Sequence, residues 1–271
     1  MALLNPRYLD AVVAIGTKKD TVWYGTGFFY GHFIKRGDKA GHVLFLVTNR
    51  HILESQIKDG NTEILLKCNS KDDGTAREMT LSLYDETGDE YSFLYHPNPN
   101  IDLAILPVDY NKIKKEMKVD YIRENQSLTI NKMKDEGVSE GDFVFILGFP
   151  MGNVGTSRKC TIVRSGIIAR ISDAFHGDSE DFLLDAFIFP GNSGGPVITK
   201  PELTGMVGTK QLDKSVLIGV VKEYLSYEEI AKSEQTGQTK VIFTENSGLA
   251  LVHPINFVNE IIRMYMKNYP Y

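Results

Sequence analysis

Short segments rich in Val, Ile, Phe, Tyr and Thr follow one another along most of the chain, and turn-forming Gly, Asp and Asn residues separate them. β-branched and aromatic residues in short runs between turn signals favour strands. Long helical patterns do not alternate with these runs, as the crossover helices of a parallel sheet would require. Many short strands of this kind predict an all-β chain that folds as a sandwich or a barrel.

The candidate strands form two series. The first comprises Val12–Ile15, Val22–Tyr30, His42–Thr48, Glu63–Cys68, Thr80–Tyr84, Tyr91–Tyr95 and Leu103–Val108. A lysine-rich stretch, 111–118, and a weakly apolar segment, 120–134, follow it, and we interpret the second of these as a connector. The second series comprises Phe143–Gly148, Cys160–Ile171, Phe182–Phe187, Pro196–Ile198, Ser215–Tyr224, Val241–Phe243 and Leu249–Val252.

The C-terminal segment has a different pattern. After Pro254, apolar side chains recur at helical spacing, which predicts an amphipathic helix of about 12 residues that docks on the rest of the protein. These side chains are Ile255, Val258, Ile261, Ile262 and Met266. Two polar segments, Lys200–Lys214 and Leu225–Asn246, are predicted as long loops. The second is either a regulatory loop or, as we favour, a solvated insertion.

Composition and charge exclude several classes of function. Of the 271 residues, 42% are apolar and 24% are charged, which is typical of a globular protein. The formal net charge is −5 and no basic stripe occurs, so nucleic acid is not an expected partner. The longest apolar runs, Phe143–Phe149 and Val216–Val221, are far shorter than a membrane span, so we expect no membrane partner either.

The cysteines and histidines do not indicate a metal site. Cys68 and Cys160 are the only cysteines, and nothing in their placement suggests a disulfide framework. The six histidines are scattered without metal-ligand spacing, so we expect no metal and no other cofactor. The first residues lack the basic and apolar regions of a secretory signal, and we therefore expect a cytoplasmic protein.

The hexapeptide Gly-Asn-Ser-Gly-Gly-Pro at 191–196 is the most specific local motif. Glycines on both sides of a serine permit unusual backbone angles and can direct several N–H groups into one concavity that suits an anion. Ser193 is therefore a candidate nucleophile beside an oxyanion hole. The alternative is a glycine-rich hairpin with an incidental serine.

A nucleophilic serine needs a base, and the base needs an orienting carboxylate. His51 follows the candidate strand His42–Thr48, and we expect it on a loop from which it can project into a cleft. Asp102 directly precedes the buried-strand pattern Leu103–Val108. Alone, His51 is typical of a surface or core histidine and Asp102 of a turn former. Together with Ser193 they form a candidate catalytic set.

These motifs, in this order, resemble the trypsin/chymotrypsin superfamily of serine proteases and are most similar to its bacterial HtrA/Deg-like branch. The resemblance covers roughly residues 20–265 and rests on Gly25–Phe29, Val47–His51, Asp102–Leu106, Gly148–Gly152, Ser165–Ile168, Asp185–Ala186 and Gly191–Pro196. The C-terminal peptide-binding PDZ domain usual in that branch is not expected here, since about 19 residues follow Val252.

The resemblance implies a single protease domain, residues 1–271, built from two Greek-key β-barrels packed at an angle. Its parts would be a first barrel at 1–118, a connector at 119–138, a second barrel at 139–253 and a C-terminal helix at 254–271. The implied activity is that of a serine endopeptidase that acts on a peptide or protein substrate. The resemblance leaves open whether an oligomeric or regulatory partner exists.

The superfamily's catalytic roles carry over by motif. Ser193 would attack the scissile carbonyl and form an acyl-enzyme, His51 would transfer the proton, and Asp102 would hold the imidazole. The N–H groups of Gly191 and Ser193 would stabilise the oxyanion.

The resemblance also places the S1 pocket, which would receive the substrate side chain before the scissile bond. The pocket residues are Phe187, Ile188, Gly248 and Ala250. The floor position, Phe187, carries no carboxylate, which implies an apolar P1 side chain, although Glu223 is a nearby acid.

Two positions depart from the family pattern. Lys222 stands where many relatives have a small hydroxyl residue near the catalytic aspartate. Asn192 stands where zymogen members have an aspartate that pairs with a new N-terminal amine, so we expect no proteolytic activation.

Two other functions are compatible with parts of the sequence. A catalytically silent binding or sensor module could use the same fold. The Gly-x-Ser-x-Gly pattern also occurs in α/β-hydrolases, for which Ser193, Asp213 and His253 have the right order. The nucleophile of that family opens a helix, however, and Gly194, Gly195 and Pro196 form helices poorly.

Overall fold

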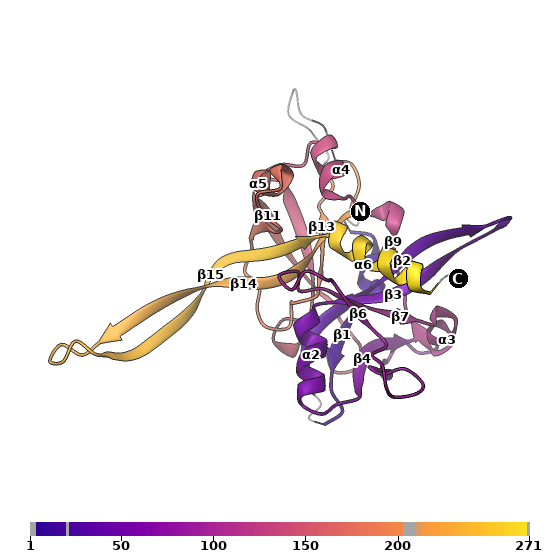
Figure 1. Cartoon of the computed structure of the whole chain (residues 1–271), viewed down its shortest axis with the longest axis horizontal. Helices are drawn as coiled ribbons and strands as arrows, with labels where there is room; N and C mark the ends of the chain where they lie inside the picture. The colour runs from indigo at the N-terminus through magenta and orange to yellow at the C-terminus, as the bar shows by residue number, and fades with distance from the viewer. Residues whose placement is uncertain (1–3, 20–21, 203–209, 211, 270–271) are drawn as a thin grey trace.

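In the computed structural model, which describes residues 4–19, 22–202, 210 and 212–269, each half of the sequence forms its own β-sheet (Figure 1). The first sheet has nine strands, in the path order β5-β4-β1-β2-β3-β7-β6, with β8 paired to β4 and β9 to β2. The strands are β1 (Val12–Gly16), β2 (Trp23–Arg36), β3 (Lys39–Thr48), β4 (Glu63–Ser70), β5 (Ala76–Ser82), β6 (Leu94–Tyr95), β7 (Ala104–Val108), β8 (Met117–Lys118) and β9 (Ile122–Arg123).

Both faces of β2 are covered where it crosses the centre of this sheet. Phe28 and Tyr30 pack into one apolar cluster, whereas Phe29, on the opposite face, packs into another. All three side chains are fully buried or nearly so. Burial on both faces explains why this part of β2 has a continuous apolar run instead of an alternating pattern.

The second sheet closes into a six-stranded barrel in the order β10-β11-β12-β15-β14-β13. Its strands are β10 (Phe143–Gly148), β11 (Ile162–Arg170), β12 (Phe182–Asp185), β13 (Pro196–Thr199), β14 (Leu217–Lys232) and β15 (Thr239–Pro254). Val144, Ile146, Val197 and Ile218 fill the interior. The two barrel-like sheets and the C-terminal helix confirm the predicted all-β, chymotrypsin-like fold class.

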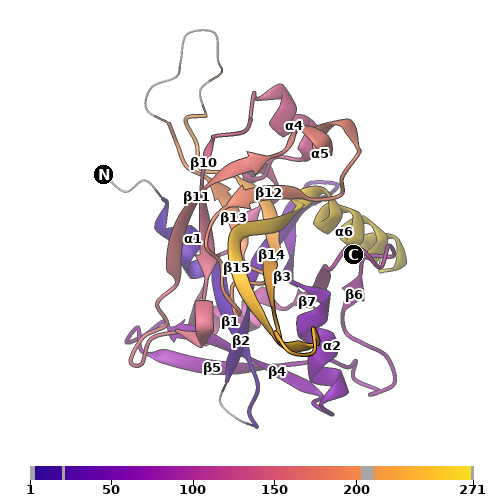
Figure 2. The same ribbon diagram turned by 90° about the vertical axis from the view of Figure 1, so that its left-hand side faces the viewer.

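The helices are short except at the C-terminus. They are α1 (Pro6–Ala11), α2 (Arg50–Lys58), α3 (Tyr110–Glu116), α4 (Ile130–Asp135), α5 (Ser172–His176) and α6 (Ile255–Asn268), with 3-10 turns η1 (Glu124–Gln126) and η2 (Pro150–Gly152). Helix α6 confirms the amphipathic pattern, because Val258 and Ile262 share a core cluster with Phe45 of β3 and Val220 of β14. The helix therefore covers the junction of the two sheets (Figure 2). Within the described residues, no helix has the length and hydropathy needed to cross a bilayer.

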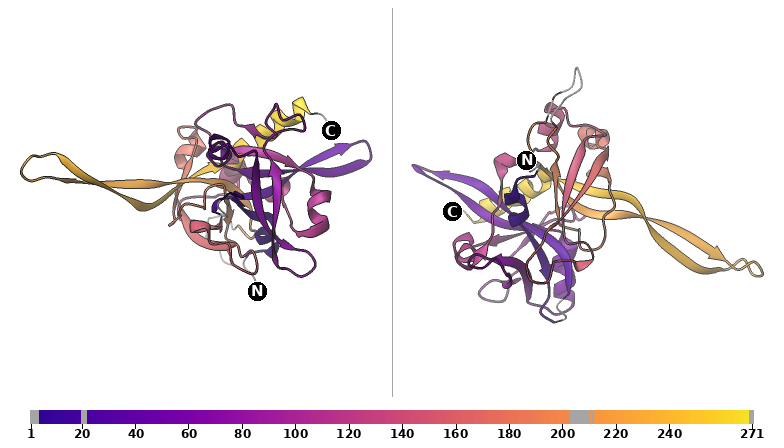
Figure 3. Two further views of the ribbon diagram at one scale, coloured as in Figure 1. Left: turned by 90° about the horizontal axis from the view of Figure 1, so that it is seen from below. Right: turned by 180° about the vertical axis from the view of Figure 1, so that it is seen from behind.

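The segment Leu225–Asn246, predicted as a loop, is a two-stranded ribbon. Strands β14 and β15 leave the barrel together and project far beyond it (Figures 1 and 3). Their pairing continues from Ser226 opposite Asn246 to Lys232 opposite Thr239. We call residues 225–246 the arm. The other predicted loop, Lys200–Lys214, lies largely outside the described residues.

Candidate active site

The first turn of α2 positions His51, which the sequence had placed on a loop. Strand β3 ends at Thr48, and the buried Asn49 then begins the helix. The Asn49 side chain donates to the carbonyl of Asp102 over 2.7 Å, which joins this helix to the segment before β7. The His51 side chain remains 53% exposed and therefore accessible from the cleft.

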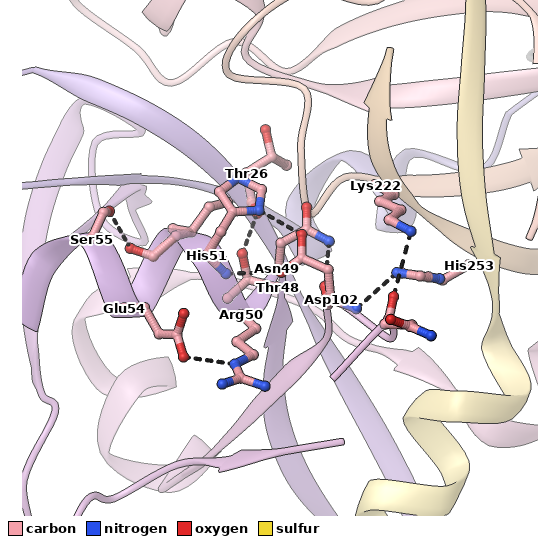
Figure 4. Close-up of polar contacts among 12 residues, drawn as sticks. Thr26, Thr48, Asn49, Arg50, His51, Glu54, Ser55, Asp102, Lys222 and His253 are labelled. Atoms are coloured by element: carbon pink, nitrogen blue, oxygen red, sulfur yellow. Dashed lines mark hydrogen bonds and ion pairs between the residues drawn. The ribbon is translucent and has the colours of Figure 1, made fainter. Parts of the chain in front are cut away.

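Both carboxylate oxygens of Asp102 contact His51 (Figure 4). One oxygen lies 2.5 Å from the His51 Nδ1, and the other accepts from the His51 backbone N–H over 2.9 Å. A carboxylate at Nδ1 favours the tautomer in which this nitrogen carries the proton. The Nε2 atom of a neutral His51 is then left as a proton acceptor.

Ser193 lies in the same cleft as this pair. The cleft has a volume of about 650 Å³ and is lined by Ser193, His51 and Asp102 among others. In the described part of the chain, the Ser193 hydroxyl makes no hydrogen bond, so it is not hydrogen-bonded to the His51 ring, which contacts Asp102. Such contacts are often loose without substrate and tighten when it binds. The structure thus brings together the three residues that the sequence nominated.

The loop before Ser193 has a conformation that requires glycine. Gly191 has φ +96°, and a Cβ at this position would lie 2.4 Å from the carbonyl oxygen of Phe149. Among the described residues, no acceptor pairs with the N–H of Gly191 or of Ser193. Two unpaired donors beside a candidate nucleophile are what an oxyanion hole requires.

Asn192 shapes this loop with an uncharged side chain. It is completely buried, and its Oδ1 accepts from the N–H of Phe189 over 3.0 Å. Its own N–H donates to the carbonyl of Phe189 over 2.9 Å. The loop is therefore closed by local hydrogen bonds at the position where zymogens use an ion pair.

Thr26 of β2 connects the first sheet to this loop, a role that the sequence analysis missed. Its hydroxyl donates to the carbonyl of Gly191 over 2.6 Å and accepts from the N–H of Phe149 over 3.1 Å. Its backbone N–H donates to the carbonyl of Ser193 over 3.0 Å. Thr48 in turn donates to the carbonyl of Thr26 over 2.8 Å. The Gly-Thr-Gly motif at 25–27 was part of the resemblance to the protease family. It did not reveal this role, because the residues that the Thr26 hydroxyl contacts, Gly191 and Phe149, are more than a hundred positions away in the sequence.

A cluster of three polar side chains lies behind Asp102: His253 is buried, whereas Lys222 and Asp181 are partly exposed (Figure 4). The Nε2 of His253 accepts from the Asp102 backbone N–H over 2.9 Å, and its Nδ1 contacts Asp181. The second carboxylate oxygen of Asp181 lies 3.0 Å from the Lys222 ammonium. Burial opposes ionisation of Asp181, but the hydrogen bond from His253 and the charge of Lys222 outweigh it and lower its pKa. Lys222, which departs from the pattern expected from the sequence, thus forms an ion pair with Asp181 in this cluster.

The four predicted S1 residues are placed differently from one another. Ile188 is buried and lines the cleft that contains Ser193. Phe187 is 55% exposed, and its ring lies against Gly248. Ala250 is completely buried in the barrel. Tyr224, which was not predicted as a pocket residue, lines the cleft as well.

No group of three or more His, Cys, Asp or Glu side chains in the described ranges could hold a metal ion. The cleft contains a serine, an imidazole and a carboxylate, and among the described residues the N–H donors beside the serine are unpaired. These are the groups that acyl transfer by a serine nucleophile uses.

The trypsin-like peptidase domain family matches residues 25–206 of the chain, which include all three candidate catalytic residues. The chain belongs to this family. As a trypsin-like peptidase domain, it also has many structural neighbours. Human heparin binding protein aligns with a TM-score of 0.56 and 12% identity, over 99% of this chain and 96% of that one. An atomic-resolution structure titled HBP aligns with a TM-score of 0.53, also at 12% identity, with the same coverage.

At this identity the structural neighbours show the fold of this trypsin-like peptidase domain and nothing further. No curated protein matched the sequence. The all-β fold is incompatible with the α/β-hydrolase alternative, and His253 packs behind Asp102, where it contacts Asp181.

Proposed function

We propose that this chain is a serine endopeptidase that hydrolyses peptide or protein substrates through Ser193, His51 and Asp102. The observation that carries the proposal is the double contact of Asp102 with His51 in the cleft that Ser193 lines. The membership of the trypsin-like peptidase domain family supports the same reaction class.

In the proposed mechanism, the Ser193 hydroxyl attacks the scissile carbonyl while the Nε2 of His51 takes its proton. Asp102 stabilises the imidazolium, and the N–H groups of Gly191 and Ser193 stabilise the oxyanion, each worth about 2.7–4 kcal/mol. The intermediate collapses to an acyl-enzyme as His51 gives the proton to the leaving amine. Water, activated by the same histidine, then releases the acyl group and restores the serine.

The proposed substrate has an apolar P1 side chain of modest size. We place the S1 pocket at Phe187, Ile188, Gly248 and Ala250, of which Ile188 already lines the cleft. A substrate Lys or Arg would have no carboxylate at the floor position, and burying an unpaired charge is costly. Peptides that differ only in a P1 Val, Ala, Leu or Arg test this preference. Efficient cleavage confined to Arg would point to Glu223 as a specificity residue instead.

Within the superfamily, we propose that the HtrA/Deg-like branch is the nearest one, because the motifs at Gly148–Gly152 and Ser165–Ile168 fit it. We also propose that the chain acts without proteolytic activation, since Asn192 closes its loop without an ion pair. Intact-mass measurement of the protein that turns over substrate tests this second point. Activity confined to N-terminally trimmed molecules would refute it.

The deciding experiment is labelling with a fluorophosphonate probe together with turnover of a peptide library. Wild type should be labelled and active, and Ser193→Ala should lose both while keeping its fold, because the hydroxyl is the covalent centre and adds little packing. Ser157→Ala, at an exposed serine, is the matched control and should behave as wild type. A folded wild type that resists the probe and cleaves nothing would favour the silent binding module.

A further inference from the structure

The outer part of the arm leaves one edge of strand β14 unpaired. From Ser226 to Lys232, β15 is the strand that pairs with β14 in the described part of the chain. This stretch lies beyond the candidate active site, because the residues of β14 that line the cleft are Lys222, Glu223 and Tyr224. An unpaired edge presents backbone N–H and C=O groups on which another strand can form.

The arm also presents apolar side chains to solvent. They are Tyr227, Ile230, Val241, Ile242 and Phe243, each about half exposed. A two-stranded ribbon by itself is marginally stable in water, and three or more strands are needed for a stable sheet. Apolar surface gathered on one projecting element is typical of an interaction site. The arm therefore has both the edge and the side chains that a partner strand would use.

The sequence of β14 in the arm is complementary to itself. Residues 228–232 read Glu-Glu-Ile-Ala-Lys. When two copies of this strand pair antiparallel about a two-fold axis at Ile230, Glu228 of each copy lies opposite Lys232 of the other. Residues that lie opposite each other share a face of the sheet, so two ion pairs flank the Ile230 contact. Within the described residues, neither Glu228 nor Lys232 forms an ion pair in its own chain.

The same axis joins the apolar side chains of the two arms. Ile230 lies opposite Ile242 within each arm, and the pairing is regular from Ser226 to Ala231. With the two Ile230 residues side by side, four isoleucines form one row across a four-stranded sheet. Aliphatic side chains in neighbouring strands stabilise a sheet by packing in this way.

Neighbouring registers lack this match. An axis at Glu229 opposes two glutamates, and an axis at Ala231 opposes Ile230 to Lys232. On the open edge of β15, an axis at Ile242 sets Lys240 against Thr244 and gives no ion pair. Charge complementarity thus selects the β14 edge and the axis at Ile230.

We propose that the open β14 edge of the arm is a dimer interface with a second copy of this chain, paired antiparallel about Ile230. The arm projects far beyond the barrel, so the two protein bodies lie at opposite ends of the joined arms (Figures 1 and 3). One pair of strands is a small interface, which is typical of a dimer that dissociates on dilution. The interface goes beyond the proposed peptidase function and does not depend on it.

Sedimentation equilibrium from low to high micromolar concentration tests the dimer. The wild type should change from monomer to dimer as its concentration rises. A trimmed variant, in which Asn-Gly replaces residues 228–244 between the paired Tyr227 and Glu245, should stay monomeric. The matched control shortens the β2–β3 hairpin by placing Asn-Gly between the paired Ile34 and Gly41, and it should dimerise as the wild type does.

A wild type that stays monomeric throughout this range would overturn the proposal and leave the arm to a different partner. A dimer that survives trimming of the arm would overturn it as well. Circular dichroism checks that each variant is folded.

Charge exchange tests the register. Glu228→Lys and Lys232→Glu each oppose like charges across the axis, so each should raise the dimer Kd at least about tenfold. An equal mixture of the two variants should form heterodimers, because both ion pairs are restored between unlike copies. Glu245→Lys makes the same charge change on β15, away from the β14 edge, and should leave the Kd unchanged. Failure of the mixture to dimerise would contradict the register.

A disulfide across the axis gives a second measurement. In a Cys160→Ser background, which removes the exposed cysteine, Ile230→Cys should yield a covalent dimer on mild oxidation. Residues opposite each other in antiparallel strands have Cα atoms about 4.5–5.5 Å apart, within the range of a disulfide. Ser226→Cys, at an exposed position of the same strand, lies far from its own counterpart and should not cross-link. Equal cross-linking of both variants would overturn the axis at Ile230.

Discussion

The imidazole of His253 accepts a hydrogen bond from the backbone N–H of Asp102 over 2.9 Å. A histidine outside the proposed catalytic set thereby supports the residue that orients His51. Because Nε2 is the acceptor, the other ring nitrogen carries the proton and faces Asp181. The Lys222 ammonium completes this chain of contacts. Three residues outside the proposed catalytic set therefore support the position of Asp102.

Replacement of His253 by Phe should lower kcat about tenfold with little change in KM. The variant keeps a ring in the site but removes the acceptor of the Asp102 N–H, and one such hydrogen bond is worth about 0.5–1.5 kcal/mol. Steady-state kinetics and probe labelling rates measure the effect. His176→Phe, at an exposed histidine, is the control and should leave both unchanged. A rise in KM alone would argue against a positioning role.

Asp181→Asn should change how stability depends on pH. The pKa of Asp181 is lowered from its ordinary 3.8, so its charged form stabilises the folded protein above that value. This contribution is lost as the pH falls through the lowered pKa. Urea unfolding from pH 7 to 2 should show the wild type more stable at neutral pH and the difference shrinking below about pH 4.

The exposed Asp178 supplies the control for this measurement, as Asp178→Asn should follow the wild-type curve. A difference between wild type and Asp181→Asn that stays constant down to the lowest pH would contradict the linkage.

Thr26→Val should lower kcat about tenfold or more. Valine keeps the shape but removes the hydroxyl that bonds both Gly191 and Phe149, so the oxyanion donors lose their alignment. Thr80→Val makes the same chemical change on β5, away from the cleft, and should have no effect on kcat. Unchanged kcat in a folded Thr26→Val protein would show that the loop is ordered without this threonine.

Gly191→Ala should reduce activity about a hundredfold. The new Cβ would collide with the carbonyl of Phe149, so the loop must move and carry the N–H donors with it. Gly177→Ala separates this collision from backbone strain, because Gly177 has φ +79° and open space around its Cβ position. The control should lose about 1–2 kcal/mol of stability and keep its activity. Equal losses of activity in both variants would contradict the explanation.

Local sequence pattern was sufficient for most of the fold. Short β-branched and aromatic runs between turn residues predicted the strands, and the spacing of Ile255, Val258, Ile261 and Ile262 predicted α6. These features follow from side-chain periodicity, which neighbouring residues encode by themselves. The Ser193 motif was visible for the same reason, since its glycines meet a local backbone requirement. His51 and Asp102 could be predicted as catalytic residues only because they occur together with Ser193, in the order His, Asp, Ser along the chain.

The tertiary structure decided the features that depend on distant partners. In the mostly polar segment Leu225–Asn246, only Val241–Phe243 was predicted as a strand. The segment forms the arm because β14 and β15 pair with each other from Ser226 to Lys232. His51 lies on a nine-residue helix that the sequence analysis did not predict, because its buried face comprises only Ile52, Leu53 and Gln56. Thr26 is hydrogen-bonded to Gly191, which is 165 positions away in the sequence, and Asp102 is hydrogen-bonded to His253, which is 151 positions away. The sequence by itself determined the strands, the C-terminal helix and the candidate nucleophile, because each is a local pattern. The contacts behind Asp102 and the pairing of the arm join segments that are distant in the sequence, and no local pattern records which segments will meet.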